Sequence, residues 1–400
     1  MNTAAETSGH SPSAAWPAMS MDETQALLCA DDAPFAMETV TIRGVPTRVW
    51  KHALPNLAEL ARTGRSHGDK TFLVYEDERV SFDGWFRAVA ALADHLRGLG
   101  VGKGDRVALA MRNLPEWPVA FFAITAIGAI CVPLNAWWTG PELAYGLADS
   151  GSKVLICDPE RLARIAPHRA DCPELERVLV SRQPGELPSA VERLEDAIGR
   201  AADYDRLPDG DLPETALHCD DPTAIFYTSG TTGNPKGAVI THRNLVTNIL
   251  SSGYNAARTF LRRGEAPPEP TTKALLVVIP LFHCTACSAM MMGAVAAGHK
   301  LVFMHKRGCG TGARPDRARA GQHHRRGADH RVATDRAPRP REVRSDQSRI
   351  DFLWRRAVRA RTGAQDPLRI RLAARQWLGH DRDLRHGDRD RRRGLSRAAR

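Results

Sequence analysis

Short apolar blocks alternate with longer amphipathic segments between residues 71 and 180. Apolar residues recur at helical spacing from Phe86 to Leu99, which predicts a helix, and Gly98 and Gly100 are signals for its end. Strands are predicted at 71–75, 79–82, 107–111, 129–134, 153–157 and 177–180, and further helices at 117–127 and 141–147. Strands that alternate with helices in this way predict an α/β fold with doubly wound, mainly parallel sheets and flanking helices.

The same pattern restarts after residues 182–220, which are rich in Pro, Asp, Glu and Gly and are expected to contain a surface connection. Strands are predicted at 224–227, 238–240 and 275–279, and a helix from His242. Residues 1–34 are mostly small or polar, so we expect a flexible N-terminus. The remaining segments are a first subdomain at about 35–181 and the start of a second at 221–306.

A loop rich in Gly, Ser and Thr carries the clearest chemical signal. It runs from Tyr227 to Gly237 with the sequence YTSGTTGNPKG. Glycines allow close approach of the backbone, hydroxyl groups donate hydrogen bonds and Lys236 adds a positive charge, which together suit a polyphosphate. The pattern differs from the common P-loop, because a strand rather than a helix follows. The predicted phosphate-binding residues are Thr228, Ser229, Gly230, Thr231, Thr232, Gly233, Lys236 and Gly237.

This loop, continued by Thr241 to Asn244, resembles the phosphate-binding signature of the adenylate-forming superfamily. That superfamily includes acyl-CoA synthetases, nonribosomal-peptide adenylation domains and luciferases. The segment from Pro280 to His283 resembles the next core motif, and segments at 71–82, 104–108 and 129–135 resemble the N-terminal part, in the style of fatty-acyl-CoA synthetases. The resemblance implies that 35–306 is part of an AMP-binding N-terminal domain and that His283 lines or gates an acyl pocket; a histidine packed beneath a strand end is the alternative.

The resemblance further implies a two-step ligase that uses ATP, Mg²⁺ and coenzyme A. A carboxylate attacks the α-phosphorus of ATP to give acyl-AMP and pyrophosphate, and the thiol of coenzyme A then displaces AMP. The first step requires stabilisation of the charge that develops on the phosphates. The family's Mg²⁺-binding Glu, ribose-binding Asp and catalytic Lys are not found in the sequence, so no catalytic residue and no metal ligand is assigned.

The composition changes abruptly after Lys306. Residues 307–400 contain 27 Arg, no Lys, 10 Asp and one Glu, whereas residues 1–306 hold 29 basic and 35 acidic side chains. An Arg-rich segment suggests nucleic-acid binding, but a GC-rich gene read in the wrong frame also yields Arg, Ala, Gly, Asp and His without Lys. The tail lacks apolar periodicity and is not expected to fold.

The frameshift interpretation can be tested against the family's missing motif. Residues 376–384, back-translated and read one base later, permit Asn-Gly-Trp-Gly-Met-Thr-Glu-Thr, which contains the expected Gly-x-Thr-Glu motif. Residues 316–324 in the same offset permit a plausible helix-to-strand sequence. We therefore expect a frameshift near residues 306–308, an incomplete domain and little or no ligase activity in this copy.

Two other functions are considered. One is an adenylate-forming ligase that loads a carrier protein instead of coenzyme A, and the other is an Arg-rich nucleic-acid-binding protein, which is disfavoured by the frameshift interpretation. The eight cysteines form no disulfide framework, which suits a reducing cytoplasm. The most apolar run, 119–134, is shorter than a membrane span and predicts a buried helix followed by a buried strand. Peripheral contact with a membrane stays open.

Overall fold

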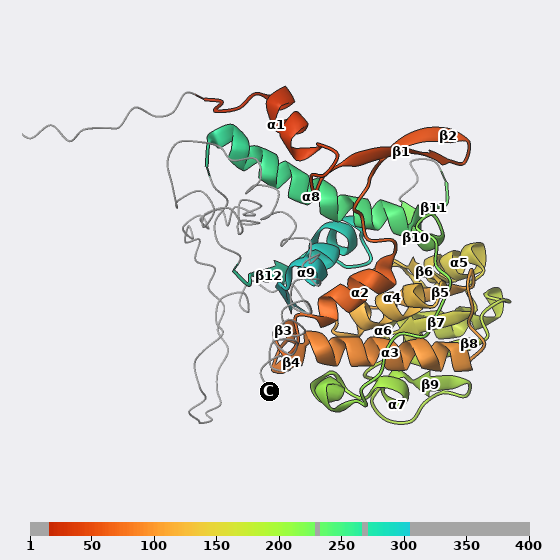
Figure 1. Ribbon diagram of the computed structural model, residues 1–400. Coiled ribbons are helices and arrows are strands. Elements are labelled where there is room, and N and C mark those ends of the chain that lie inside the picture. Colours follow the sequence, from red (N-terminus) through yellow and green to blue (C-terminus); the bar gives the residue numbers. More distant parts are fainter. Residues whose placement is uncertain (1–15, 229–232, 266–270, 305–400) are drawn as a thin grey trace, which may run out of the picture.

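The structure contains two main β-sheets with helices packed on and between them (Figure 1). It is a computed structural model that describes residues 16–228, 233–265 and 271–304. The strands are β1 (Met37–Ile42), β2 (Val45–Trp50), β3 (Thr71–Tyr75), β4 (Glu78–Ser81), β5 (Arg106–Ala110), β6 (Ile130–Pro133), β7 (Val154–Cys157), β8 (Arg177–Val180), β9 (Val191–Arg193), β10 (Pro222–Thr228), β11 (Lys236–Thr241), β12 (Ala274–Val277) and β13 (Lys300–Phe303). The α-helices are α1 (Met21–Leu28), α2 (Leu57–Arg65), α3 (Phe82–Gly98), α4 (Glu116–Ala126), α5 (Gly140–Ser150), α6 (Pro159–Ile165), α7 (Leu194–Ile198), α8 (His242–Arg263) and α9 (Met292–Ala297).

The larger sheet has the strand order β11-β10-β6-β5-β7-β8-β9. All neighbouring pairs are parallel except β10 with β11. The first strand of this sheet along the chain is β5. The next strand, β6, lies on one side of β5, and β7, β8 and β9 then follow on the other side. This order confirms the predicted doubly wound fold and creates a switch point between β5 and β7, where such sheets bind ligands beyond the carboxyl ends of their strands.

Side chains of β5 alternate between two hydrophobic clusters, one on each face of the larger sheet. Val107 and Leu109 belong to the cluster that contains residues of α2, α3 and α4. Ala108 and Ala110 belong to the cluster that contains residues of α5 and α6. A strand covered on both faces needs small or apolar residues at its buried positions, and the four buried residues of β5, Val107 to Ala110, meet this need.

The smaller sheet has the order β12-β13-β3-β4 and so joins strands from distant parts of the chain. Likewise, β10 and β11 pair with the larger sheet through β6. Each sheet therefore contains strands from both 35–181 and 221–306. The two segments therefore do not form separate sheets. Their division into two subdomains stays a prediction.

The apolar segment at 119–134 forms most of α4 and then β6. Every residue of α4 is buried, including Glu116, which binds Arg182. The expected buried helix and buried strand are thus present. Among the helices that the structure describes, none is long and apolar enough to cross a bilayer.

The described part of the N-terminal segment contains a helix, and the flexibility expected for residues 1–34 stays a prediction. Residues 21–28 form α1, whose start is fixed by a capping box in which Ser20 and Glu23 bond to each other's backbone N–H groups. The β1–β2 hairpin follows and was not predicted. Phe35, Trp50 and Tyr254 pack ring against ring, which attaches this segment to the long helix α8 (Figure 1).

Candidate functional site

The carboxyl edge of the larger sheet gathers the predicted site residues. Strands β5, β6, β7 and β10 run in parallel, so the loops that follow them leave the sheet at the same edge. The predicted phosphate loop follows β10. Arg112 and Asn113 follow β5, Trp137 follows β6 and Asp158 follows β7. The described ends of the predicted phosphate loop therefore lie at the carboxyl edge of the sheet, where the fold class binds its ligands.

The two ends of the phosphate loop are held together by the β10–β11 hairpin. Thr228, the last residue of β10, pairs with Lys236, the first residue of β11. The Thr228 hydroxyl also donates a hydrogen bond of 3.4 Å to the Lys236 carbonyl. The Lys236 side chain is exposed and has no ion-pair partner in the described ranges, so its ammonium group is available to an anion. Ser229, Gly230, Thr231 and Thr232 lie outside the described residues.

Two glycines of the motif are explained by local geometry. Gly233 has a φ of 103°, a conformation that L side chains rarely adopt. Gly237 lies so close to β10 that an added Cβ would be 2.6 Å from Ile225 Cγ2. Gly237 therefore permits close pairing at the mouth of the hairpin, which is a structural reason for a glycine directly after Lys236.

His283 is the exposed residue of a turn whose Leu281 and Phe282 are buried, and this turn is attached to the same sheet edge. Asn113, after β5, donates to the carbonyls of Val277 (3.3 Å) and Ile279 (3.0 Å) and accepts from the N–H of Leu281 (2.8 Å). The Phe282 ring contacts the Trp137 ring edge to face, with centroids 5.3 Å apart.

The exposed position of His283 excludes a histidine packed beneath a strand end. A π-helix at Thr285–Met291 follows this turn. The role of His283 in an acyl pocket stays a prediction.

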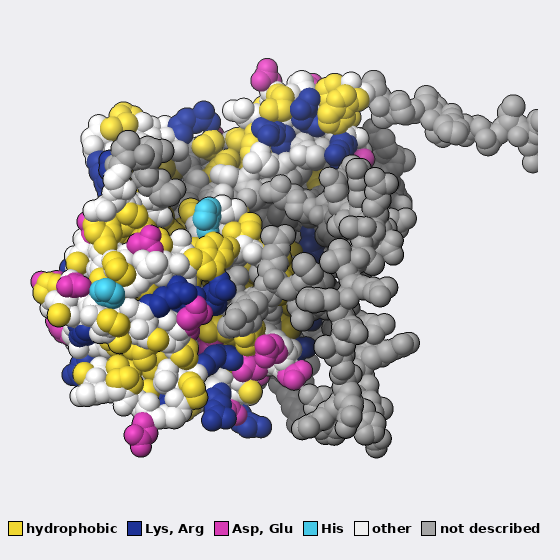
Figure 2. Space-filling view, turned by 180° about the vertical axis from the view of Figure 1, so that it is seen from behind, with side chains coloured by type: hydrophobic (Ala, Val, Ile, Leu, Met, Phe, Trp, Pro, Cys, Tyr) yellow, Lys and Arg dark blue, Asp and Glu magenta, His cyan; other side chains and the backbone are white. Residues whose placement is uncertain are grey.

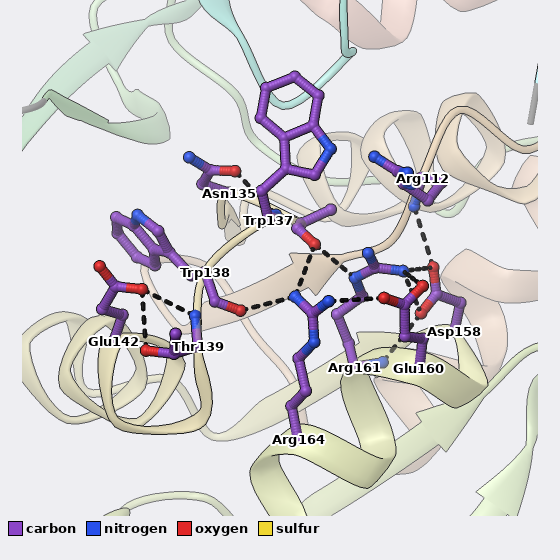
Figure 3. A network of polar contacts seen from close by, with 11 residues as sticks. Arg112, Asn135, Trp137, Trp138, Thr139, Glu142, Asp158, Glu160, Arg161 and Arg164 are labelled. Carbon is purple, nitrogen blue, oxygen red and sulfur yellow. Dashed lines mark hydrogen bonds and ion pairs between the residues drawn. The ribbon is translucent and has the colours of Figure 1, made fainter. Parts of the chain in front are cut away.

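A polar network stabilises the loops after β6 and β7 at this edge (Figure 3). Arg161 is 1% exposed and binds both oxygens of Asp158, at 3.0 and 2.9 Å, and the carbonyl of Ala136 at 2.7 Å. The second carboxylate oxygen of Asp158 also accepts from the N–H of Arg112. One buried ion pair thus connects the chain segments that follow β5, β6 and β7.

A possible metal cluster of the described residues does not have the character of a metal site. The ligand atoms of His218, Cys219 and Asp220 lie within 4.8 Å of one another. The guanidinium group of Arg243 donates hydrogen bonds to Asp220 at 2.6 Å and to the Cys219 sulfur at 2.7 Å, so its positive charge already occupies the place that a metal ion would take. In the CxxC pair, Cys284 is exposed whereas Cys287 is buried. We assign no metal ligand among the described residues.

Sequence reasoning predicted a phosphate loop and missed the residues that contact its two ends. Tyr145 and Asp149 of α5 contact the β10–β11 hairpin, and Asn113 fixes the His283 turn. The four-residue spacing of Tyr145 and Asp149 indicates a shared helix face, but it does not indicate what that face contacts.

The AMP-binding enzyme family model matches residues 60–315. The matched range includes the phosphate loop, the His283 turn and most of both sheets. The chain therefore belongs to the AMP-binding enzyme family, as the resemblance predicted.

Curated relatives of the chain are CoA ligases. It is 32% identical to 4-coumarate–CoA ligase 2 of Oryza sativa subsp. japonica over 54% of this chain and 37% of the relative. It is 35% identical to long-chain-fatty-acid–CoA ligase FadD13 of Mycobacterium tuberculosis over 51% of this chain and 35% of the relative. The chain thus spans little more than a third of the length of these relatives.

Solved structures show the same fold. The anthranilate CoA ligase AuaEII in complex with anthranoyl-AMP matches with a TM-score of 0.53 and 25% identity, over 63% of this chain and 45% of that one. The N-terminal domain of FACL13 from Mycobacterium tuberculosis matches with a TM-score of 0.51 and 27% identity, over 64% of this chain and 58% of that one. These matches confirm the predicted fold of an adenylate-forming N-terminal domain.

Proposed function

We propose that the chain derives from an ATP-dependent carboxylate–CoA ligase that activates a fatty or related carboxylic acid. In that reaction the acid and ATP form acyl-AMP and pyrophosphate, and coenzyme A then takes up the acyl group. The observation that carries the proposal is the hairpin at Thr228–Gly237, whose exposed Lys236 lies at the carboxyl edge of the sheet. The similarity to several CoA ligases supports coenzyme A, rather than a carrier protein, as acceptor.

The described residues fit a polyphosphate. The Lys236 ammonium group would offset phosphate charge, and the glycine at 237 brings the second strand of the hairpin close to the first. Magnesium would add charge neutralisation during transfer of the adenylyl group, but the described residues provide no ligand set for it. The proposal therefore assigns phosphate binding to this hairpin and leaves the catalytic residues unassigned.

We propose further that this copy binds nucleotide without completing ligation. The later family motifs are missing from residues 307–400, where the composition matches a shifted reading frame. Resequencing the codons for residues 305–311 tests this part directly. If resequencing finds a base more or less than the present gene sequence has, the true product is a longer ligase. If the sequence is confirmed and the protein still releases AMP in a CoA- and acid-dependent way, the proposed loss of activity is contradicted.

The described residues on the face in Figure 2 add no support for nucleic acid as a partner. Figure 2 shows a face on which acidic and basic side chains lie among hydrophobic ones, without a continuous basic area on its coloured part. A cytoplasmic location is part of the proposal, because the cysteines of the described ranges are free thiols.

Nucleotide binding can be measured by calorimetry with ATP and Mg²⁺. Lys236→Ala should weaken ATP binding by roughly tenfold or more, since a hydrogen-bonded charge pair is lost. Lys70→Ala, which removes an exposed lysine beside β3 of the smaller sheet, is the matched control and should bind ATP like the wild type. Absence of ATP binding by the wild type, or equal binding by both variants, would contradict the proposal.

A further inference from the structure

Helix α5 contacts the predicted phosphate hairpin through two tyrosine hydroxyl groups. The Tyr145 hydroxyl, on α5, donates a hydrogen bond of 3.1 Å to the carbonyl of Pro235. The Tyr227 hydroxyl, on β10, donates a hydrogen bond of 2.6 Å to Asp149 on α5. One bond runs from the helix to the hairpin and the other from the hairpin to the helix. The Tyr227 hydroxyl also lies 3.4 Å from the carbonyl of Gly146 on α5, a second and longer contact with the helix.

Both hydrogen bonds lie at the mouth of the loop. Tyr227 precedes Thr228, the last residue of β10, and Pro235 precedes Lys236, the first residue of β11. Tyr227 pairs directly with Gly237 across the hairpin. The contacts therefore fix the position where each strand enters the loop, including the residue next to the only lysine of the motif.

Aromatic packing supports the same arrangement. The Tyr227 ring contacts the rings of Trp138 and Tyr145 edge to face, with centroids 5.7 and 6.5 Å apart. Burial and the neighbouring Asp149 raise the pKa of both tyrosines, so their hydroxyl groups stay protonated donors at neutral pH.

Strand β11 needs such support because it is the edge strand of the larger sheet. Its first four residues are exposed, and Val239 is 54% exposed, so burial contributes little to holding its beginning in place. Its Lys236 end is held by pairing with β10 and by the bond from the Thr228 hydroxyl, and the bond from Tyr145 fixes the preceding Pro235.

We infer that Tyr145, Tyr227 and Asp149 form a brace that positions Pro235 and Lys236 for polyphosphate binding. This inference rests on the proposed function and adds positioning residues from α5 to the site. The brace acts before the ligand arrives: it restricts the hairpin to one arrangement, so less conformational entropy is lost when phosphate binds. The three side chains need not touch the ligand.

Each substitution has a distinct expected effect. Tyr145→Phe keeps the ring and removes the bond to Pro235, so ATP affinity should fall roughly threefold to tenfold, as for the loss of one neutral hydrogen bond. Asp149→Ala removes the nearer acceptor of Tyr227 and leaves only the longer contact of 3.4 Å with the Gly146 carbonyl, so it should have a similar effect. Asp149→Asn keeps an acceptor oxygen and should restore most of the affinity.

The test combines calorimetry with hydrogen exchange on the full chain, using ATP with Mg²⁺ as the probe. In the absence of nucleotide, Tyr145→Phe and Asp149→Ala should speed exchange of the backbone amides of residues 236–241, while Asp149→Asn should not. The melting temperature should change little. Tyr254→Phe, which removes a hydroxyl from α8 outside the brace, is the matched control and should leave exchange and affinity unchanged.

The outcomes separate the brace from the proposed function. Unchanged exchange and unchanged ATP affinity in Tyr145→Phe and Asp149→Ala would overturn the brace while leaving nucleotide binding intact. If the variants exchange faster but the wild-type protein itself binds no ATP, the role in polyphosphate binding is overturned together with the proposed function. Faster exchange with weaker ATP binding, both restored by Asp149→Asn, is the expected result.

Discussion

The side-chain oxygen of Asn113 accepts a hydrogen bond of 2.8 Å from the backbone N–H of Leu281. The nitrogen of the same amide group donates to the carbonyls of Val277 and Ile279. One buried side chain thus satisfies three backbone groups between the end of β12 and the turn that carries His283. It connects the smaller sheet to the carboxyl edge of the larger one.

Asn113→Ala should lower the free energy of unfolding by about 2–3 kcal/mol, because it leaves buried backbone groups without a partner. Urea unfolding of the purified chain measures this change. Asn56→Ala is the matched control: Asn56 caps α2 through a hydrogen bond of 3.0 Å to the N–H of Glu59, and its loss should cost about 1 kcal/mol. A cost for Asn113→Ala no larger than that of the control would contradict the role given to Asn113.

Gly237→Ala should destabilise the hairpin at the phosphate loop. The new methyl group would lie 2.6 Å from Ile225 Cγ2, so the strands must move apart, at a cost of about 1–3 kcal/mol. Combining it with Ile225→Ala removes the clash, and the double variant should lose less stability than the sum of the two single variants. Additive losses in thermal unfolding would show that this contact is not the cause.

The stability of the protein should fall as the pH is lowered through the range set by His242. Burial lowers the pKa of His242 to about 4, and its Nδ1 accepts a hydrogen bond from the N–H of Leu57. Between pH 6.5 and 4 the unfolded chain takes up a proton that the folded protein does not. This one histidine should therefore cost about 3 kcal/mol across that range.

His242→Asn should flatten that part of the pH profile of the free energy of unfolding. Burial also lowers the pKa of His299 to about 4, so His299→Asn should have a similar effect and the two should add. Above pH 6.5 neither variant should change the slope. A profile for His242→Asn with the wild-type slope between pH 6.5 and 4 would show that this histidine does not cause the loss.

Arg161→Leu should cost about 3–5 kcal/mol, because it leaves the carboxylate of Asp158 buried without its partner. The double variant with Asp158→Asn should recover part of this loss, since the buried charge is then absent. Arg206→Ala breaks an exposed ion pair with Asp203 and should cost less than 1 kcal/mol. Chemical denaturation of the four proteins would refute the argument if Arg161→Leu resembled Arg206→Ala.

Local patterns predicted most of the elements around the site. Strand β8 was predicted with its observed bounds, and α3 ends at Gly98, where the glycines indicated a stop. These elements follow from apolar spacing and from the backbone preferences of glycine, which are properties of neighbouring residues. The hairpin β1–β2 was missed, although a glycine such as Gly44 is a turn signal that the sequence shows. In the structure Gly44 lies at the turn with a φ of 80°.

Contacts between distant segments were beyond a single sequence. Nothing near Tyr145 indicates that its hydroxyl group meets Pro235, 90 residues later. In the same way, Asn113 is an unremarkable polar residue until the fold brings Leu281 to it. The sequence therefore allowed a prediction of the phosphate loop, whereas the residues that contact its ends and the His283 turn required the tertiary structure.

The pairing of Leu73 in β3 with Leu301 in β13 also affects when the smaller sheet can form. During synthesis β3 and β4 leave the ribosome early, but the strand that lies beside β3 follows roughly 230 residues later. A ribbon of two strands is only marginally stable by itself, and distant pairings form slowly. Until β13 has emerged, the backbone N–H and C=O groups along this edge of β3 have no strand to pair with, so the edge is open to pairing with other chains.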